Sequence, residues 1–226
     1  MQKIVFVVAT RAKQEDFYAS TATGRSLKFY GFPFVELDLH ADNSTSLSEV
    51  YNRSIEKYID QDVVLVFAHD DLHLLDFFWA RHLFEGLSVY DLLGIVGNRK
   101  RSPMQPSWAF LDTQGTWDKP ENFSGVVGHG HQFPGESLGI FGVNGEVQLL
   151  DGLWLAAKSE TFKRTGVRFD ARFKFHFYDM DICRSATQAG LKLGTVPISM
   201  IHESKGNFSS PSWIEGYQIY IDKWGS

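Results

Sequence analysis

Val63 to Leu72 reads VVLVFAHDDL, an apolar run that ends abruptly in His69, Asp70 and Asp71. A short continuous apolar run is typical of a strand that is buried on both faces, and we expect one over Val63–Ala68. This strand would deliver one imidazole and two carboxylates to its C-terminal end.

A second acidic segment, Phe175–Arg184, reads FHFYDMDICR and precedes a helix that we expect over Ile182–Ala189, closed by Gly190. It places Asp179 and Asp181 at the junction of loop and helix. Because a helix N-terminus stabilises negative charge, we expect these carboxylates to be ionised. Taken alone, the pair is better explained as a helix cap than as a reactive site.

A third segment, Val196–Gly206, reads VPISMIHESKG and is a strand-like stretch that ends in His202, Glu203 and Lys205. Acids or imidazoles therefore follow three separate apolar or aromatic runs. Open α/β sheets bind their ligands at the carboxyl ends of the strands. The three segments together predict a ligand site at that edge.

The other apolar segments alternate along the chain as in a doubly wound α/β sheet. The expected strands are Ile4–Thr10, Phe34–Leu39, Leu92–Val96 and Gln148–Ala157. The expected helices are Ser46–Ile59, Leu74–Leu87 and Ser159–Thr165. Residues Asn98–Gly145 are rich in Gly, Pro and polar side chains, so we expect a loop-rich insert that is functional or mobile.

The composition excludes several classes of function. A net charge of −5 argues against a nucleic-acid partner, which would need clustered basic residues. Cys183 is the single cysteine, so an intramolecular disulfide and a cysteine metal site are excluded. No apolar run approaches the ~20 residues that an integral membrane segment needs, and no signal-peptide layout is present. We expect a cytoplasmic protein, or one that is peripheral at a membrane.

In order and spacing, these segments together resemble the GT-A glycosyltransferases, and most closely their family-2-like group. The matching parts are the N-terminal strand, the strand ending in His-Asp-Asp, the LDG segment Leu150–Gly152, the FYDMDICR segment from Phe177 and the trailing His202. The resemblance extends from Ile4 to about Gly206.

The resemblance implies the GT-A, Rossmann-like fold of nucleotide-diphospho-sugar transferases, in which helices flank a mixed central sheet. It implies a single domain over residues 1–226, which is complete or one module of a longer protein. Residues 1–97 would form the nucleotide-sugar-binding half. Residues 98–226 would form the acceptor-binding and catalytic half.

The implied activity is that of a metal-dependent hexosyltransferase, which moves a sugar from a nucleotide sugar, expected to be a UDP-sugar, to a glycan or lipid-linked glycan with inversion. Asp71 and His202 are expected to hold Mn²⁺ or Mg²⁺. Asp179 is expected to be the base that takes the acceptor proton. His69 stands where the family commonly has Asp, so His69 and Asp70 are expected to orient ribose or water rather than to bind metal.

The same resemblance implies contacts to the donor and the acceptor. The expected nucleotide contacts lie at the strand tips, on the helix that follows and beyond the last strand: Thr10, Arg11, Asp42, Asn43, Asn52 and Lys205. The expected acceptor contacts are Asp151, Gly152 and Trp154. Gly152 would let a sugar approach closely and Asp151 would accept its hydroxyl, whereas Trp154 fits the core better than a sugar platform.

Three alternatives remain open. A glycoside hydrolase would use paired carboxylates and would need neither metal nor nucleotide. A nucleotidyltransferase would favour a Gly-rich phosphate loop near the N-terminus, which VVATRAKQ lacks. An inactive nucleotide- or sugar-binding module is favoured only by His69 in place of Asp.

Overall fold

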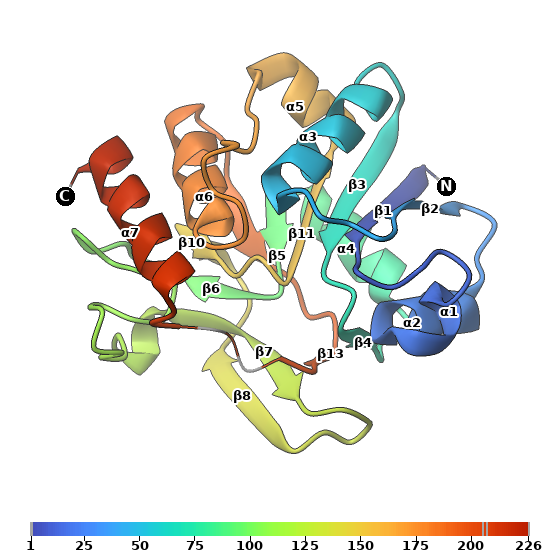
Figure 1. The fold of residues 1–226 in the computed structure, drawn as a ribbon, viewed down its shortest axis with the longest axis horizontal. Helices are drawn as coiled ribbons and strands as arrows, with labels where there is room; N and C mark the ends of the chain where they lie inside the picture. The colour runs from blue at the N-terminus through green and yellow to red at the C-terminus, as the bar shows by residue number, and fades with distance from the viewer. Residues whose placement is uncertain (1, 205, 207, 226) are drawn as a thin grey trace.

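The computed structural model describes residues 2–204, 206 and 208–225, which form a mixed α/β fold with two sheets (Figure 1). The first sheet has seven strands in the order β2-β1-β3-β11-β5-β12-β9. Its strands are β1 Lys3–Ala9, β2 Val35–His40, β3 Val63–Ala68, β5 Leu92–Gly94, β9 Glu146–Val147, β11 Trp154–Lys158 and β12 Leu193–Thr195.

The second sheet has six strands in the order β10-β6-β7-β13-β4, with β8 paired to β7 off this path. Its strands are β4 Leu72–Leu74, β6 Val96–Asn98, β7 Phe123–His129, β8 Ser137–Gly142, β10 Leu149–Leu150 and β13 Met200–His202. The helices are α1 Phe17–Ser20, α2 Ala22–Tyr30, α3 Leu47–Tyr58, α4 Trp79–Leu87, α5 Ser159–Thr165, α6 Tyr178–Gln188 and α7 Pro211–Trp224, with one 3₁₀ turn, η1, at Pro120–Asn122.

The centre of the first sheet follows the expected α/β pattern. Strands β1, β2 and β3 are parallel, so their carboxyl ends share one edge, and β11 runs antiparallel to β3 and begins at that edge. Every residue of β3 is buried, as its continuous apolar run predicted. The edge where these strands end is therefore the edge at which polar side chains collect.

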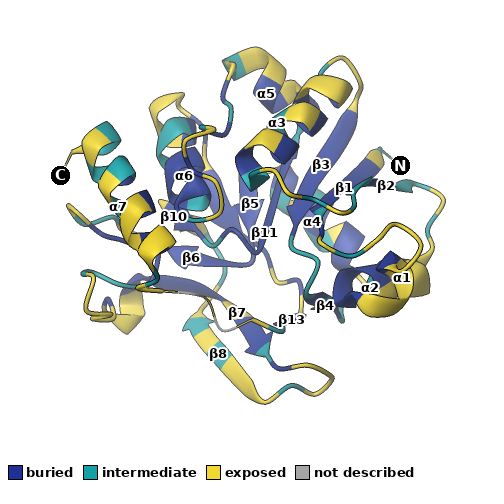
Figure 2. Cartoon of the chain, viewed as in Figure 1, coloured by how far each residue is buried: buried dark blue, intermediate teal, exposed yellow. Residues whose placement is uncertain are grey.

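Helices cover both faces of this sheet, and the alternation of side chains along the strands decides which helix meets which residue. Phe67 of β3 contacts Tyr51 of α3 and Phe162 of α5, with ring centroids 4.9 and 5.9 Å apart. On the opposite face, Phe6 of β1 contacts Trp79 of α4 at 5.5 Å. Figure 2 shows the result: the central strands are buried and the outward sides of the helices are exposed.

The second sheet was largely missed by the sequence analysis. The expected loop-rich insert contains β7 and β8, which form an antiparallel pair. Glycines interrupt both strands, and β8 alternates exposed and half-buried residues, so neither shows a continuous apolar run. The expected strand Gln148–Ala157 is also divided, because β10 joins the second sheet and β11 the first.

Two helices differ from expectation. Helix α6 begins at Tyr178, four residues earlier than predicted, so that Asp179 and Asp181 lie inside its first turn. The expected helix Leu74–Leu87 is shorter, because Leu74 ends β4 and α4 begins at Trp79. Among the described residues, none of the helices combines the length and the apolar character needed to cross a membrane.

Candidate metal centre and active site

Strand pairing brings the downstream histidine to the end of β3. Asp71 lies between β3 and β4, and β4 pairs antiparallel with β13 so that His202 lies opposite Leu72. The backbone N–H of Glu203 donates to the carbonyl of Asp71 at 3.0 Å and continues this pairing. The expected partners Asp71 and His202 are therefore neighbours.

Three side chains form a candidate metal centre: His69, Asp71 and His202, whose ligand atoms all lie within 4.8 Å of one another. Oδ1 of Asp71 is 3.3 Å from Nε2 of His202 and 3.9 Å from Nδ1 of His69. Among the described residues, neither Asp71 Oδ1 nor His202 Nε2 has a hydrogen-bond partner, although both atoms are buried. Because buried polar atoms are normally satisfied, this pair fits a bound cation.

The orientation of His69 also fits a ligand. Its Nε2 lies 2.8 Å from the hydroxyl of Tyr178, which donates its own proton to the carbonyl of Gly152 at 2.9 Å. The hydroxyl oxygen must then accept from His69, so Nε2 carries the proton and Nδ1 presents its lone pair toward Asp71. His69 is therefore oriented as a candidate metal ligand, whereas it was expected to orient ribose or water.

The charges of the three groups are coupled. Burial disfavours the protonated form of His202, but the adjacent Asp71 carboxylate outweighs burial and raises the pKa of His202 above its usual value. Burial alone would raise the pKa of Asp71, whereas the two imidazoles, and His202 above all, lower it. Burial and then the charge of His202 lower the pKa of His69. A bound cation would therefore compete with the proton that the Asp71 carboxylate favours on His202.

Asp179 lies in the first turn of α6 beside the same strand edge. Its two oxygens accept from the backbone N–H groups of Met180, at 2.9 Å, and Gly152, at 3.2 Å. Burial, followed by the negative charge of Asp151, raises the pKa of Asp179 to about 7. Burial also raises the pKa of Asp181. For Asp179, desolvation therefore outweighs the stabilisation of negative charge that was expected from the helix N-terminus.

Asp151 and Gly152 precede β11 and line the approach to Asp179. One oxygen of Asp151 accepts from the indole N–H of Trp108 at 2.6 Å, and the other accepts from the N–H of Leu153 at 2.9 Å. A Cβ on Gly152 would lie 2.4 Å from the hydroxyl of Tyr178 and 3.0 Å from Cβ of Asp179. Glycine is therefore required here by the first turn of α6, and this packing replaces the expected close approach of a sugar.

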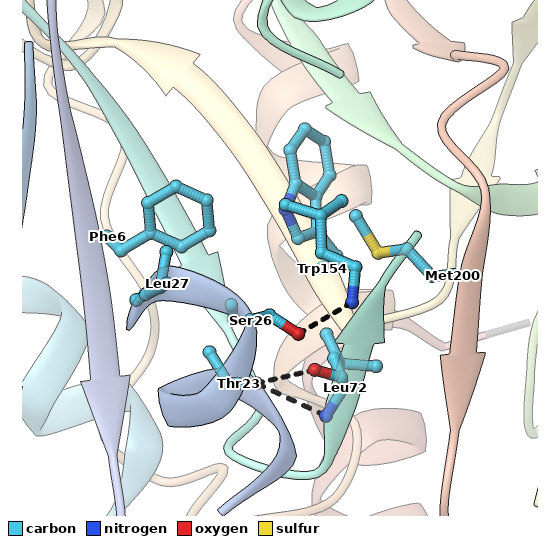
Figure 3. A pocket seen from close by; sticks show the side chains of 9 residues that line it. Phe6, Thr23, Ser26, Leu27, Leu72, Trp154 and Met200 are labelled. Atoms are coloured by element: carbon cyan, nitrogen blue, oxygen red, sulfur yellow. Dashed lines mark hydrogen bonds between the residues drawn. The ribbon is translucent and has the colours of Figure 1, made fainter. Parts of the chain in front are cut away.

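Trp154 belongs to the core. Its side chain is 1% exposed and lines an internal cavity of about 10 Å³ together with Phe6, Leu27 and Met200 (Figure 3). A cavity of this size holds at most one water molecule. Trp154 is therefore inaccessible to an acceptor, which corrects the expectation that it contacts one.

Thr10 and Asp70, two of the expected nucleotide contacts, are hydrogen-bonded to each other and join the ends of β1 and β3. The Thr10 hydroxyl donates to Asp70 at 2.5 Å and accepts from the N–H of Ala12 at 3.0 Å. Thr10 is 3% exposed, so its role at the tip is structural. The side-chain amide of Asn52 is hydrogen-bonded to the backbone of Phe169, to which it donates at 2.7 Å and from which it accepts at 3.0 Å. The expectation that Asn52 faces the nucleotide is not met.

Asp42 and Asn43 lie beside an open hollow of about 420 Å³ beyond the ends of β1 and β2. The side chain of Asn43 is bonded to Thr45 and shapes this turn. Arg11 is exposed at the tip of β1. Lys205 lies outside the described residues.

Comparison with known proteins gives a likeness of fold and none of sequence. No family model matches the chain, and no curated protein matches it. The structure is similar to that of GalNAc-T7, a glycosyltransferase solved with UDP, GalNAc and Mn²⁺, with a TM-score of 0.57 and 11% identity over 99% of this chain. This chain spans 48% of that one. A197 from STIV also matches, with a TM-score of 0.47 and 10% identity over 93% of this chain and 100% of that chain.

Several residues around the site have contacts that were not expected from the sequence. Tyr178 orients His69, and its only signal was its place next to Asp179. Trp108 donates to Asp151 from the region expected to be a loop. The hollow is lined in addition by Gln14, His40 and Arg53, which come from three separate segments and show no common pattern.

Proposed function

We propose that this chain is a metal-dependent glycosyltransferase of the GT-A fold, organised as a single domain. It transfers a hexosyl group from a nucleotide sugar, a UDP-sugar, to a glycan or lipid-linked glycan. The observation that carries the proposal is the group of His69, Asp71 and His202 at the carboxyl edge of the sheet, in which two buried polar atoms have no hydrogen-bond partner among the described residues. The similarity of the fold to a glycosyltransferase supports it.

The donor set fits Mn²⁺ better than Mg²⁺, since two of its three ligands are imidazoles. His69, Asp71 and His202 would hold the ion, and phosphate oxygens of the donor and water would complete its ligands. When bound, a divalent cation neutralises the charge that develops on a departing diphosphate.

In this proposal the hollow beyond β1 and β2 receives the nucleoside. Asp42, Asn43 and Arg53 line it. Because the amide of Asn43 is bonded to Thr45, the carboxylate of Asp42 and the guanidinium group of Arg53 are the proposed contacts to a base or a ribose. Arg11 is free to approach a phosphate from the tip of β1. Lys205 follows closely on His202 in sequence, and we assign it the same role.

Asp179 is the proposed base. A pKa of about 7 suits a group that must take a proton at neutral pH. Asp151 is positioned beside it by Trp108 and is the proposed acceptor contact. A single base that faces the leaving group across the sugar implies inversion at the anomeric carbon.

The decisive experiment is calorimetric titration of UDP and GDP with Mn²⁺ and then with EDTA. We expect metal-dependent binding of UDP that is lost in Asp71→Ala. The matched control is Asp60→Ala, which removes an 81% exposed acid just before β3, at the opposite edge of the sheet. Absence of nucleotide binding in both conditions, in a folded protein, would refute the proposal.

One observation favours a second candidate, a glycoside hydrolase that uses Asp151 and Asp179 as its two carboxylates. The charge of Asp151 contributes to the raised pKa of Asp179, as in a general acid. That candidate leaves the unsatisfied atoms of Asp71 and His202 without a purpose. It becomes the better proposal if no nucleotide binds and a glycan is hydrolysed in EDTA.

A further inference from the structure

Phe177, which immediately precedes α6, has an unusual backbone. Its φ is +64° and its ψ is 0°, the left-handed conformation that residues other than glycine seldom adopt. It is the N-cap of α6 and makes no side-chain cap hydrogen bond, although its carbonyl accepts from the N–H of Asp181 at 2.9 Å. Such a conformation persists only where the surroundings hold it.

Helix α7 supplies those surroundings. Phe177 is 3% exposed, and the centroid of its ring is 5.4 Å from that of Trp213, 5.8 Å from that of Tyr217 and 5.6 Å from that of Tyr220. The ring rests against Gly216, where a Cβ would lie 3.0 Å from Cδ2 of Phe177. Glycine in the middle of a helix is unfavourable, so its presence here points to this close approach.

The C-terminal end of α7 contacts α6 at Asp181. The indole N–H of Trp224 donates to Asp181 at 2.7 Å, and the ammonium group of Lys223 lies 2.7 Å from the same carboxylate oxygen. Asp181 is fully buried, so these contacts are shielded from water. Helix α7 therefore spans the first turn of α6 from Phe177 to Asp181 (Figure 1).

The residues that follow Phe177 are the ones the site depends on. The hydroxyl of Tyr178 fixes the ring of His69, and Asp179 is held by the N–H of Gly152. A change at Phe177 to an ordinary backbone conformation would redirect both side chains, because they follow directly from that turn.

We propose that α7 is a positioning clamp, which holds Phe177 in its left-handed conformation and thereby sets Tyr178 and Asp179 at the site. The inference rests on the proposed function, since it assigns a role to the groups that surround the metal ligands and the base. The clamp consists of Trp213, Gly216, Tyr217 and Tyr220, all of which lie on α7 and contact Phe177.

The test is Gly216→Ala, because a purely structural role and the clamp predict opposite results. Alanine gains about 1 kcal/mol in helix propensity over glycine, whereas its methyl crowds the buried ring of Phe177, so the two effects oppose each other and the thermal midpoint is expected to change little. The added methyl displaces the ring of Phe177, so calorimetry is expected to show roughly ten-fold or greater loss of Mn²⁺ affinity through Tyr178 and His69. Carbon-13 NMR is expected to show the pKa of the Asp179 carboxyl falling below about 7 as water reaches it.

The matched control is Glu215→Ala, an exposed position one residue away on the same helix, which should change neither readout. If Gly216→Ala is poorly folded, Phe177→Leu replaces it and is expected to lower Mn²⁺ affinity to a similar extent. The double variant Gly216→Ala/Phe177→Leu should lose less than the sum of the two single losses, because both act through one contact.

A folded Gly216→Ala with unchanged Mn²⁺ affinity and an unchanged Asp179 pKa would overturn the clamp, as would strictly additive losses in the double variant. The two proposals fail separately. If the wild-type protein binds Mn²⁺ but no nucleotide, the transferase proposal falls while the affinity comparison still decides the clamp. If it binds no metal, the Asp179 titration decides the clamp alone.

Discussion

The buried carboxyl group of Asp179 lowers the stability of the folded protein near neutral pH. The pKa of Asp179 is about 7 in the folded protein, against an ordinary value of 3.8. The folded state therefore favours the protonated acid, and its contribution to the free energy of unfolding is lost as the pH rises from about 4 to about 7. If Asp179 is the base, as we propose, a group that can accept a proton near neutral pH is obtained at a cost in stability.

This sign leads to a prediction for Asp179→Asn. The variant cannot ionise at this position, so it does not lose stability there as the pH rises. The free energy of unfolding of the variant minus that of the wild type should therefore increase by roughly 2–3 kcal/mol between pH 5 and pH 8. Urea unfolding of both proteins at the two pH values measures the difference. A difference that is constant across this range would mean that Asp179 titrates near its ordinary value.

Helix α3 begins at a capping box that can be recognised in the sequence. The Ser46 hydroxyl accepts from the N–H of Glu49 at 3.2 Å, and the Glu49 carboxylate accepts from the N–H of Ser46 at 3.3 Å. This reciprocal capping box fixes the helix that packs Tyr51 against β3 below the site.

We expect Ser46→Ala to lower the free energy of unfolding by about 1 kcal/mol, because it leaves an N–H at the helix start without its acceptor. Urea denaturation measures the loss. Ser44→Ala, at an exposed position two residues earlier, is the matched control and should unfold like the wild type. Equal stability of the two variants would remove the energetic role of the capping box.

The same elements show why some of the structure could be predicted and some could not. Strand β3 and helices α3 and α5 were predicted within a residue, because an apolar run or a helical period defines each of them. The start of α6 was missed, since Phe177 begins it through a left-handed turn imposed by α7 and without a capping side chain. A backbone conformation that a helix distant in sequence maintains cannot be predicted from the local sequence.

The candidate site, too, could be predicted only in part. That Asp71 and His202 belong together could be inferred because each ends an apolar segment at the sheet edge. The antiparallel pairing of β4 with β13, which makes them adjacent, is a contact between segments far apart in sequence. The packing role of Gly152 and the orientation of His69 toward Asp71 depend on Tyr178, and neither could be inferred from spacing.

Across the whole molecule, the candidate metal group draws its residues from both sheets. His69 follows β3 of the first sheet, whereas His202 ends β13 of the second. Asp71 lies on the short connection between β3 and β4, which belong to different sheets. An ion held by all three would therefore link the two sheets at the carboxyl edge, and the free energy of its binding would add to that of folding.

The last prediction follows from this linkage. A ligand at 100 times its dissociation constant adds about 2.7 kcal/mol to the stability of the folded state. For a chain of this length, that amount corresponds to a rise in the thermal midpoint of about 5–10 °C. We expect such a rise with Mn²⁺ and UDP together, and its reversal by EDTA, in calorimetric unfolding scans. Asp71→Ala should show no shift and Asp60→Ala the full one. Because the predicted link needs both sheets, a wild-type midpoint that is indifferent to Mn²⁺ and UDP would mean that no ion joins them.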